Sequence, residues 1–187
     1  MHELAERLTA HPVIAAVKTP AAIEAALHSE CETVFLLSSS LGTVRPLVRR
    51  IHDAGKLAIV HVDLVEGLSS REMAVDGLLE ICRPDGLIST HPQMVRRARQ
   101  LGLLTIQRTF LIDSLSLSGL PAQLRISQPD FVEILPGVMP QIISEVVGES
   151  GCPVIAGGLI RSKKEVLDAL HAGASAVSTS SAEIWTL

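Results

Sequence analysis

Short apolar runs and amphipathic segments alternate along the whole chain. The apolar runs begin about every 23 residues, a spacing that fits strand–helix units joined by short loops. Each run is rich in Val, Ile, Leu and Ala, as expected for strands that are buried on both faces. We therefore predict eight strands, at 13–18, 33–38, 57–63, 85–90, 104–110, 131–135, 154–156 and 176–177.

Helical patterns fill most of the intervals between these strands, and capping residues mark several of their ends. Thr19 and Pro20 start one helix, and Ser162 can cap another that stops at Gly173. Further helices are expected to end at Pro12, at Gly55, near Ile81 and at Gly102. Residues 112–128 show no clean helix, so we predict a loop with a short helical piece there. A last helix at 181–187 would be scarcely two turns long.

The alternation of strands and helices indicates a parallel sheet with right-handed crossovers. The fold class is therefore α/β. Eight such units predict that the sheet closes into a compact (β/α)8 TIM barrel, which forms a single domain over residues 1–187. No GxGxxG follows the first strand, which counts against a dinucleotide-binding sheet. Such barrels typically have about 250 residues, so a chain of 187 residues would be close to the minimum size.

Composition and charge narrow the class of protein. Hydrophobic residues make up 47% of the chain and aromatic residues only 2%, which suits strands covered by Ala- and Leu-rich helices. The net charge of −4 provides no global basic field for nucleic acid. Cys31, Cys82 and Cys152 lack disulfide or zinc spacing, so we expect free thiols in a reducing cytoplasm. No signal peptide or membrane span is apparent, which predicts a cytoplasmic protein without membrane contact.

Two neighbouring strand ends near the C-terminus have the composition of a phosphate site. The seventh predicted strand opens into Gly157 and Gly158, and the eighth opens into Ser178, Thr179 and Ser180. Glycines let an anion approach backbone N–H groups, and hydroxyls add further donors. In (β/α)8 barrels the loops after strands 7 and 8 often hold a phosphate. For either turn alone, tight turning and helix capping would be the favoured explanation of these residues, but the two turns together favour a phosphate site.

Charged residues interrupt apolar strands at the end where barrel sites lie. His61 and Asp63 are two residues apart, so on a strand both side chains would leave the same face. They could bind polyol hydroxyls or act as acid and base. A hydrogen-bonded histidine beside a loop-capping aspartate is the alternative.

Glu133 lies between apolar neighbours in FVEIL, where a lone carboxylate would be destabilising. Lys18 or Arg108 could supply the partner cation. Arg108 has a planar fork suited to phosphate, although pairing with Glu133 would account for it equally well. Lys18 could bind phosphate, form a Schiff base or simply be exposed.

No metal or cofactor motif is present: the seven histidines are scattered and lack HExxH spacing. Two local clusters of arginines are the best candidates for contact with a nucleic-acid backbone, although such clusters are usually solvated faces. They comprise Arg45, Arg49 and Arg50 on one predicted helix and Arg96, Arg97 and Arg99 on another.

Several segments together resemble one known family. They are HVDLVEGLSSRE, DGLISTHP, IQRTFLIDSLSL, PDFVEILPGVMP, VIAGGLIRSKKEV and GASAVSTS, in matching order from about Pro12 to Trp185. The sequence resembles the glycerol-3-phosphate-responsive antiterminators, which regulate glycerol uptake operons in bacteria. The resemblance implies a (β/α)8 barrel and a regulator, not an enzyme, that binds glycerol 3-phosphate and an mRNA leader.

The resemblance also implies roles for particular residues. The segments with Gly157, Gly158, Ser178, Thr179 and Ser180 match the family and would hold the phosphate. Contacts to the glycerol part or to phosphate would come from Lys18, His61, Asp63, Arg108, Glu133 and Gly137. The acidic net charge leaves RNA binding implied by the resemblance alone, and the sequence leaves homo-oligomerisation open.

Two other hypotheses come from different classes. The barrel could be an enzyme acting on a phosphorylated triose or a related sugar, with His61, Asp63, Glu133 and Lys18 as base, acid and nucleophile. Turnover, or trapping of a Lys18 adduct by borohydride, would favour that hypothesis. A barrel that serves only as an interaction scaffold would bind no phosphorylated polyol.

Overall fold

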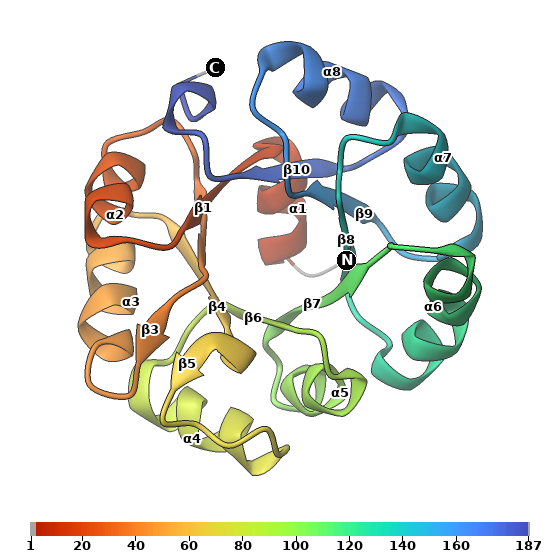
Figure 1. Cartoon of the computed structure of the whole chain (residues 1–187). Helices are drawn as coiled ribbons and strands as arrows, with labels where there is room; N and C mark the ends of the chain where they lie inside the picture. The colour runs from red at the N-terminus through yellow and green to blue at the C-terminus, as the bar shows by residue number, and fades with distance from the viewer. Residues whose placement is uncertain (1–2, 187) are drawn as a thin grey trace.

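The computed structural model describes residues 3–186 and shows a closed barrel of eight parallel strands, as the sequence predicted (Figure 1). Around the barrel the strand order is β1-β10-β9-β8-β7-β6-β4-β2, so chain neighbours pair and the last strand closes on the first. The strands are β1 (Val13–Val17), β2 (Thr33–Leu36), β4 (Leu57–His61), β6 (Gly86–Ser89), β7 (Leu104–Phe110), β8 (Phe131–Leu135), β9 (Val154–Gly157) and β10 (Ala176–Thr179).

Seven helices form a ring outside the strands (Figure 1). They are α2 (Pro20–Leu27), α3 (Val44–Asp53), α4 (Met73–Cys82), α5 (Pro92–Gln100), α6 (Ser114–Ser127), α7 (Pro140–Glu149) and α8 (Lys163–His171). The predicted caps are confirmed: the Thr19 hydroxyl accepts from the Ala22 N–H, and Ser162 forms a capping box with Glu165. Among residues 3–186, no helix combines the length and apolar character needed to cross a membrane.

The first helix has a separate role. Helix α1 (Glu3–Ala10) lies across the barrel axis instead of in the outer ring (Figure 1). Its buried residues Ala5 and Leu8 belong to the cluster that fills the barrel interior, together with Phe35 and Phe131. Because α1 leads directly into β1, it closes the end of the barrel where the strands begin. The opposite end is left for a site.

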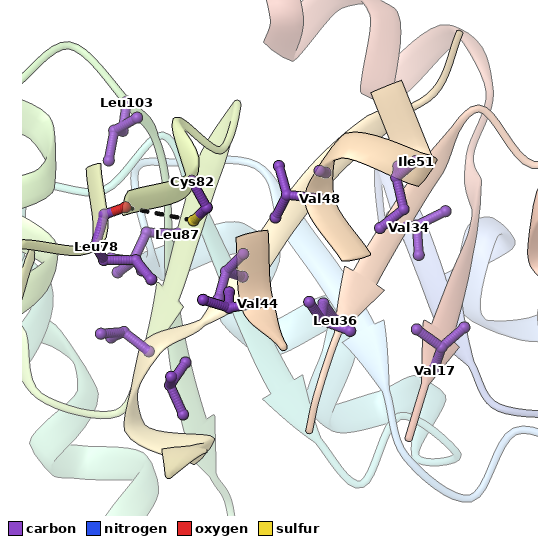
Figure 2. Packing of buried hydrophobic residues seen from close by; sticks show 14 of the residues in the cluster. Val17, Val34, Leu36, Val44, Val48, Ile51, Leu78, Cys82, Leu87 and Leu103 are labelled. Atoms are coloured by element: carbon purple, nitrogen blue, oxygen red, sulfur yellow. Dashed lines mark hydrogen bonds between the residues drawn. The ribbon is translucent and has the colours of Figure 1, made fainter. Parts of the chain in front are cut away.

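The core outside the strands is built from small aliphatic side chains. Figure 2 shows Val34 of β2 beside Ile51 of α3, and Val17, Leu36 and Val48 belong to the same buried cluster. Beside them, the Cys82 thiol donates to the Leu78 carbonyl oxygen at 3.3 Å. Close-packed aliphatic layers of this kind explain how so few aromatic residues suffice. The three cysteines are free, as predicted.

The prediction of a loop with only a short helical piece for residues 112–128 was wrong, because α6 is a helix of 14 residues. Asp113 and Ser116 form a capping box at its start, and Leu120 and Leu124 provide its buried face. Gly119 and Pro121 lie inside the helix, where both residues are unfavourable. Capping and burial outweigh them.

The expected last helix is also corrected. Between β10 and residue 186 the chain forms a single 3-10 turn, η2 (Ala182–Ile184), in place of the expected helix. Trp185 follows it, is 2% exposed, and donates its indole N–H to the Thr179 carbonyl oxygen at 2.9 Å. A single large side chain thus seals the gap that an eighth outer helix fills in longer barrels.

Two further departures lie at the open end of the barrel. Strand β4 stops at His61, and Asp63 lies in a 3-10 turn, η1 (Val62–Leu64), so the predicted strand to Asp63 was too long. Two short strands that the sequence did not predict, β3 (Ser39–Ser40) and β5 (Val65–Glu66), pair beside it.

Candidate functional site

A cavity of about 490 Å³ opens at the end of the barrel where the strands finish. Its walls come from β1, β7, β8 and β10 and from the residues that follow the ends of β1, β2, β9 and β10. Of the predicted ligand-binding residues, it is lined by Lys18, Arg108, Glu133, Gly158, Ser178, Thr179 and Ser180. The structure therefore brings both predicted phosphate turns to one cavity.

A buried ion pair forms the polar floor. Glu133 is fully buried, and its two oxygens accept from the Arg108 Nε–H and the Ser178 hydroxyl, each at 2.6 Å. The pairing of Glu133 with a cation is thus observed, and that cation is Arg108. Within residues 3–186, no hydrogen bond engages the terminal Nη groups of Arg108. Since Arg108 lines the cavity, these donors are available to an anion placed there.

The turns after β9 and β10 are joined directly. The Thr179 hydroxyl donates to the Ile160 carbonyl oxygen at 2.7 Å and accepts from the Ser181 N–H at 3.1 Å. Gly158 and Leu159 both have positive φ, 77° and 64°, which bends the first turn sharply. For Leu159 this conformation costs about 1 kcal/mol. Strain of this size persists where the surroundings impose it, as they often do at functional sites.

Two other glycines hold the strands close together beneath the cavity. A Cβ at Gly157 would lie 2.5 Å from Glu133 Oε1 and 2.7 Å from Ser178 Oγ. A Cβ at Gly137 would lie 2.7 Å from the Gly157 nitrogen. Neither residue lines the cavity. Gly157 thus allows close packing against Glu133 and Ser178, and Gly137 allows the chain after β8 to lie against the backbone of β9.

Lys18 is exposed at the end of β1, beyond the buried part of the strand. It lines the main cavity and also a second hollow of about 300 Å³, which includes Ser38, Ser39 and Ser40. Within the described chain its ammonium makes no ion pair. An anion in the main cavity would have this cation at its edge.

His61 and Asp63 do not line the cavity. Asp63 accepts from the Ser89 hydroxyl at 2.5 Å and from the Thr90 N–H at 2.7 Å, which fixes the turn after β6. Burial acts to raise the Asp63 pKa, but the hydrogen bonds from Ser89 and Thr90 keep it below its usual value. Asp63 therefore acts here as a capping aspartate.

His61 is 3% exposed, and its Nδ1 has no hydrogen bond within residues 3–186. Asp63 Oδ2 lies 4.0 Å from His61 Nδ1, which is too far for a hydrogen bond. Burial, and after it the positive charge of Arg108, lowers the pKa of His61 to about 4. The ring is thus neutral at physiological pH and adds no charge to the barrel interior.

The two arginine clusters lie on outer helices and are largely neutralised. Arg50 pairs with Glu24, and Arg97 pairs with Asp76. Arg49, Arg96 and Arg99 lie 3.9, 4.0 and 3.4 Å from Asp53, Glu72 and Asp130, respectively. Of the six, only Arg45 has no ion pair among residues 3–186. The geometry gives little support to a backbone contact through either cluster.

Sequence reasoning missed the apolar wall and one cation of the cavity. Phe110, Ile112, Leu135 and Leu159 line it, as does Arg161. A signal was present, because Phe110 ends a predicted strand and Arg161 follows the second glycine turn. Apolar residues at strand ends resemble core positions, so only the closed barrel shows that they border a cavity.

Comparison with known proteins identifies the family. The chain is 40% identical to the uncharacterized protein YgcP of Escherichia coli K12 over 180 residues, 96% of this chain and 94% of that protein. The glycerol uptake operon antiterminator regulatory protein of Listeria monocytogenes superposes with a TM-score of 0.90 and 34% identity, over 93% of this chain and 94% of that one. A glycerol uptake operon antiterminator-related protein of Thermotoga maritima superposes with a TM-score of 0.82 and 30% identity, over 93% of this chain and 97% of that one.

More distant structures share the fold alone. Deoxyribose phosphate aldolase of Aeropyrum pernix gives a TM-score of 0.70 at 18% identity, over 95% of this chain and 88% of that one. The model of the family described as "Glycerol-3-phosphate responsive antiterminator" matches residues 13–185. These residues contain all the strands of the barrel and the whole cavity. The chain therefore belongs to the family of glycerol-3-phosphate responsive antiterminators.

Proposed function

We propose that this chain is a cytoplasmic transcription antiterminator that senses glycerol 3-phosphate. The effector binds in the cavity at the open end of the barrel, and the occupied protein binds an mRNA leader and permits expression of glycerol genes. The family supports the regulatory role, and the cavity supports the effector. In this proposal the barrel is a sensor without catalytic turnover.

The observation that carries the proposal is the unused fork of Arg108. Glu133 accepts from the Arg108 Nε–H, and no group among residues 3–186 bonds to the terminal nitrogens, which remain for a ligand. Arg161 and Lys18 line the same cavity, which thus has three cations and one carboxylate. This surplus of positive charge complements the dianionic phosphate of a small ester.

The glycerol part requires neutral polar partners and an apolar wall. The Ser178 hydroxyl donates to Glu133 and keeps lone pairs that can accept from a polyol. Leu135, Pro136 and Ile160 cover the remaining surface. A few polar groups in a largely apolar cavity of about 490 Å³ are usual for small-molecule sites.

Calorimetric titration tests effector binding. Glycerol 3-phosphate should bind, and glycerol or inorganic phosphate should bind far more weakly, because each provides only part of the contacts. Lys18→Gln should weaken binding and reduce its dependence on salt. The matched control is Lys164→Gln, because Lys164 lies outside the cavity and pairs with Asp168. Absence of heat with glycerol 3-phosphate would overturn the proposal.

A second titration tests the coupling to RNA. Gel shift on the leader transcript of the glycerol genes from the source genome should show tighter binding with glycerol 3-phosphate. Linkage requires RNA to strengthen effector binding by the same factor, which is typically 5–150-fold. Equal RNA affinity with and without the effector would refute the sensor model. Consumption of triose phosphates, or a borohydride-trapped Lys18 adduct, would instead support an enzyme.

A further inference from the structure

We propose that a rim surface, formed by Phe110 and Arg161 at the edge of the cavity and by Lys163 at the start of α8 beside them in sequence, holds a single-stranded segment of the RNA. In this arrangement one base stacks on Phe110, and the adjoining phosphates contact Arg161 and Lys163. This inference rests on the proposed function for the RNA partner. It adds which face of the barrel the RNA meets.

Phe110 is unusual for this chain. The sequence has three phenylalanines, one tryptophan and no tyrosine. Phe35, Phe131 and Trp185 are buried, whereas Phe110 is 53% exposed at the end of β7. The only aromatic side chain of these types that faces solvent therefore lies on the cavity rim. An exposed ring of this kind offers a stacking platform for an unpaired base.

The neighbours of Phe110 extend this apolar surface. Ile112 is 81% exposed and Leu159 is 59% exposed, and both line the same cavity. Exposed apolar side chains clustered around one opening commonly mark an interaction site. The chemistry of the occupant follows from the charges beside them.

Those charges favour a polyanion. Arg161 and Lys163 are exposed at the start of α8, and within residues 3–186 neither side chain makes a hydrogen bond or ion pair. The carboxylates nearest in sequence are already occupied. Asp113 accepts from the Ser116 N–H at 2.7 Å, and Glu165 accepts from the Arg161 and Ser162 N–H groups at 2.7 and 2.9 Å. The rim thus has free cations beside acids that are engaged in helix caps.

The outer helices offer the opposite arrangement. Five of the six arginines on α3 and α5 face carboxylates within 4.0 Å. A phosphate contact there would first have to displace an acid. The rim needs no such exchange, so it is the better surface for phosphates despite having fewer cations.

The rim also places RNA next to the effector. Phe110 and Arg161 line the cavity as well as its edge, so an effector below them would restrict both side chains. RNA would then bind side chains that are already ordered, which gives positive coupling. A stacked base must be unpaired, so the segment recognised is a loop or a single strand and not a duplex.

Cross-linking tests the location. The probe is a random 40-nucleotide RNA pool that contains 4-thiouridine, irradiated with the full chain in the presence of glycerol 3-phosphate. We expect cross-links on the tryptic peptide 109–125, which contains Phe110 and not the arginines of α3 or α5. Cross-links confined to α3 or α5 would overturn the proposal.

Affinity measurements on the same pool give an independent test. Phe110→Ala should weaken RNA binding at least about 5-fold, which is the smallest effect expected when the stacking of one base is lost. Lys163→Gln should make the dependence of RNA affinity on salt less steep. The slope of log K against log salt concentration should fall in magnitude by about 0.7, the value for one phosphate contact on a single strand. Arg96→Gln is the matched control, since Arg96 faces Glu72, and it should change little.

The outcomes separate this inference from the proposed function. Lys163 lies outside the cavity, so Lys163→Gln should leave glycerol 3-phosphate binding unchanged. If the chain binds effector and RNA normally but Phe110→Ala and Lys163→Gln have no effect on RNA, the rim assignment is wrong. Equally, if Phe110→Ala converts a dimer into a monomer without changing RNA affinity, the rim is a contact between copies. If the unaltered chain does not bind glycerol 3-phosphate, the proposed function itself is contradicted.

Discussion

Arg108 on β7 and Glu133 on β8 are direct partners in the strand register, and the Arg108 Nε–H donates to Glu133 Oε2 at 2.6 Å. The Ser178 hydroxyl on β10 donates to the other carboxylate oxygen of Glu133, Oε1, at 2.6 Å. Three strands are thereby tied together at the floor of the cavity. A buried pair of this kind contributes little net stability, but breaking it leaves an uncompensated charge.

Glu133→Ala should therefore destabilise the fold strongly. Arg108 is 6% exposed and would lose its carboxylate partner, a loss that costs about 3–5 kcal/mol for buried pairs. Urea unfolding followed by circular dichroism measures the change. Glu183→Ala is the control, because Glu183 is exposed and its change should be within about 0.5 kcal/mol. Equal midpoints for Glu133→Ala and the unaltered chain would contradict the role of the pair.

Gly157→Ala should disturb the same floor by steric means. The added Cβ would lie 2.5 Å from Glu133 Oε1 and 2.7 Å from Ser178 Oγ, so both groups would have to move. Overpacking of this kind costs about 1–3 kcal/mol, and glycerol 3-phosphate should bind more weakly in calorimetry.

Gly148→Ala is the matched control for that change. It lies within α7, and a Cβ there would meet nothing within 4 Å. The substitution should stabilise the chain by about 0.4–1 kcal/mol, because alanine loses less entropy in a helix. If both glycine variants unfolded at the same urea concentration, the close contact at Gly157 would have no energetic consequence.

The sequence alone predicted the architecture, because buried parallel strands and their caps are local signals. It could not predict α6, since Gly119 and Pro121 mask a helix that depends on its capping box and on burial of Leu120. The extent of the strand before Asp63 was likewise decided by tertiary hydrogen bonds from Ser89 and Thr90.

The site was predictable in part for the same reason. Gly158 and Thr179 stand out by residue type at adjacent strand ends, and the barrel brings them to one cavity. Phe110 and Leu159 do not stand out, because an apolar residue at a strand end is ordinary until the structure shows it exposed.

His61 should make the fold sensitive to mild acid. Its pKa is lowered from 6.5 to about 4 in the folded chain, so below pH 6.5 the unfolded chain binds a proton that the folded chain does not. The free energy of unfolding should therefore fall as pH decreases from 6.5 towards 4, by up to about 3 kcal/mol, and this contribution should level off below that range. Urea unfolding at several pH values measures the fall.

The variant His61→Gln removes that titration and should show a shallower fall across the same range. His171→Gln is the control, since His171 is exposed on α8, and its pH profile should match that of the unaltered chain. A profile for His61→Gln as steep as that of the unaltered chain would assign the acid sensitivity to other groups.

Thr179→Val should loosen the junction of the two turns while preserving side-chain shape. The hydroxyl donates to the Ile160 carbonyl oxygen at 2.7 Å and accepts from the Ser181 N–H at 3.1 Å, and valine can do neither. Leaving these buried groups unpaired costs about 1–3 kcal/mol, and the mobile turns should bind glycerol 3-phosphate more weakly in calorimetry. Thr186→Val is the control, because Thr186 is exposed and its hydroxyl donates a long hydrogen bond to the Glu183 carbonyl oxygen, at 3.4 Å. If Thr179→Val retained full affinity and stability, the hydroxyl bridge would not be what holds the turns together, and the backbone pairing of β9 with β10 would have to do so alone.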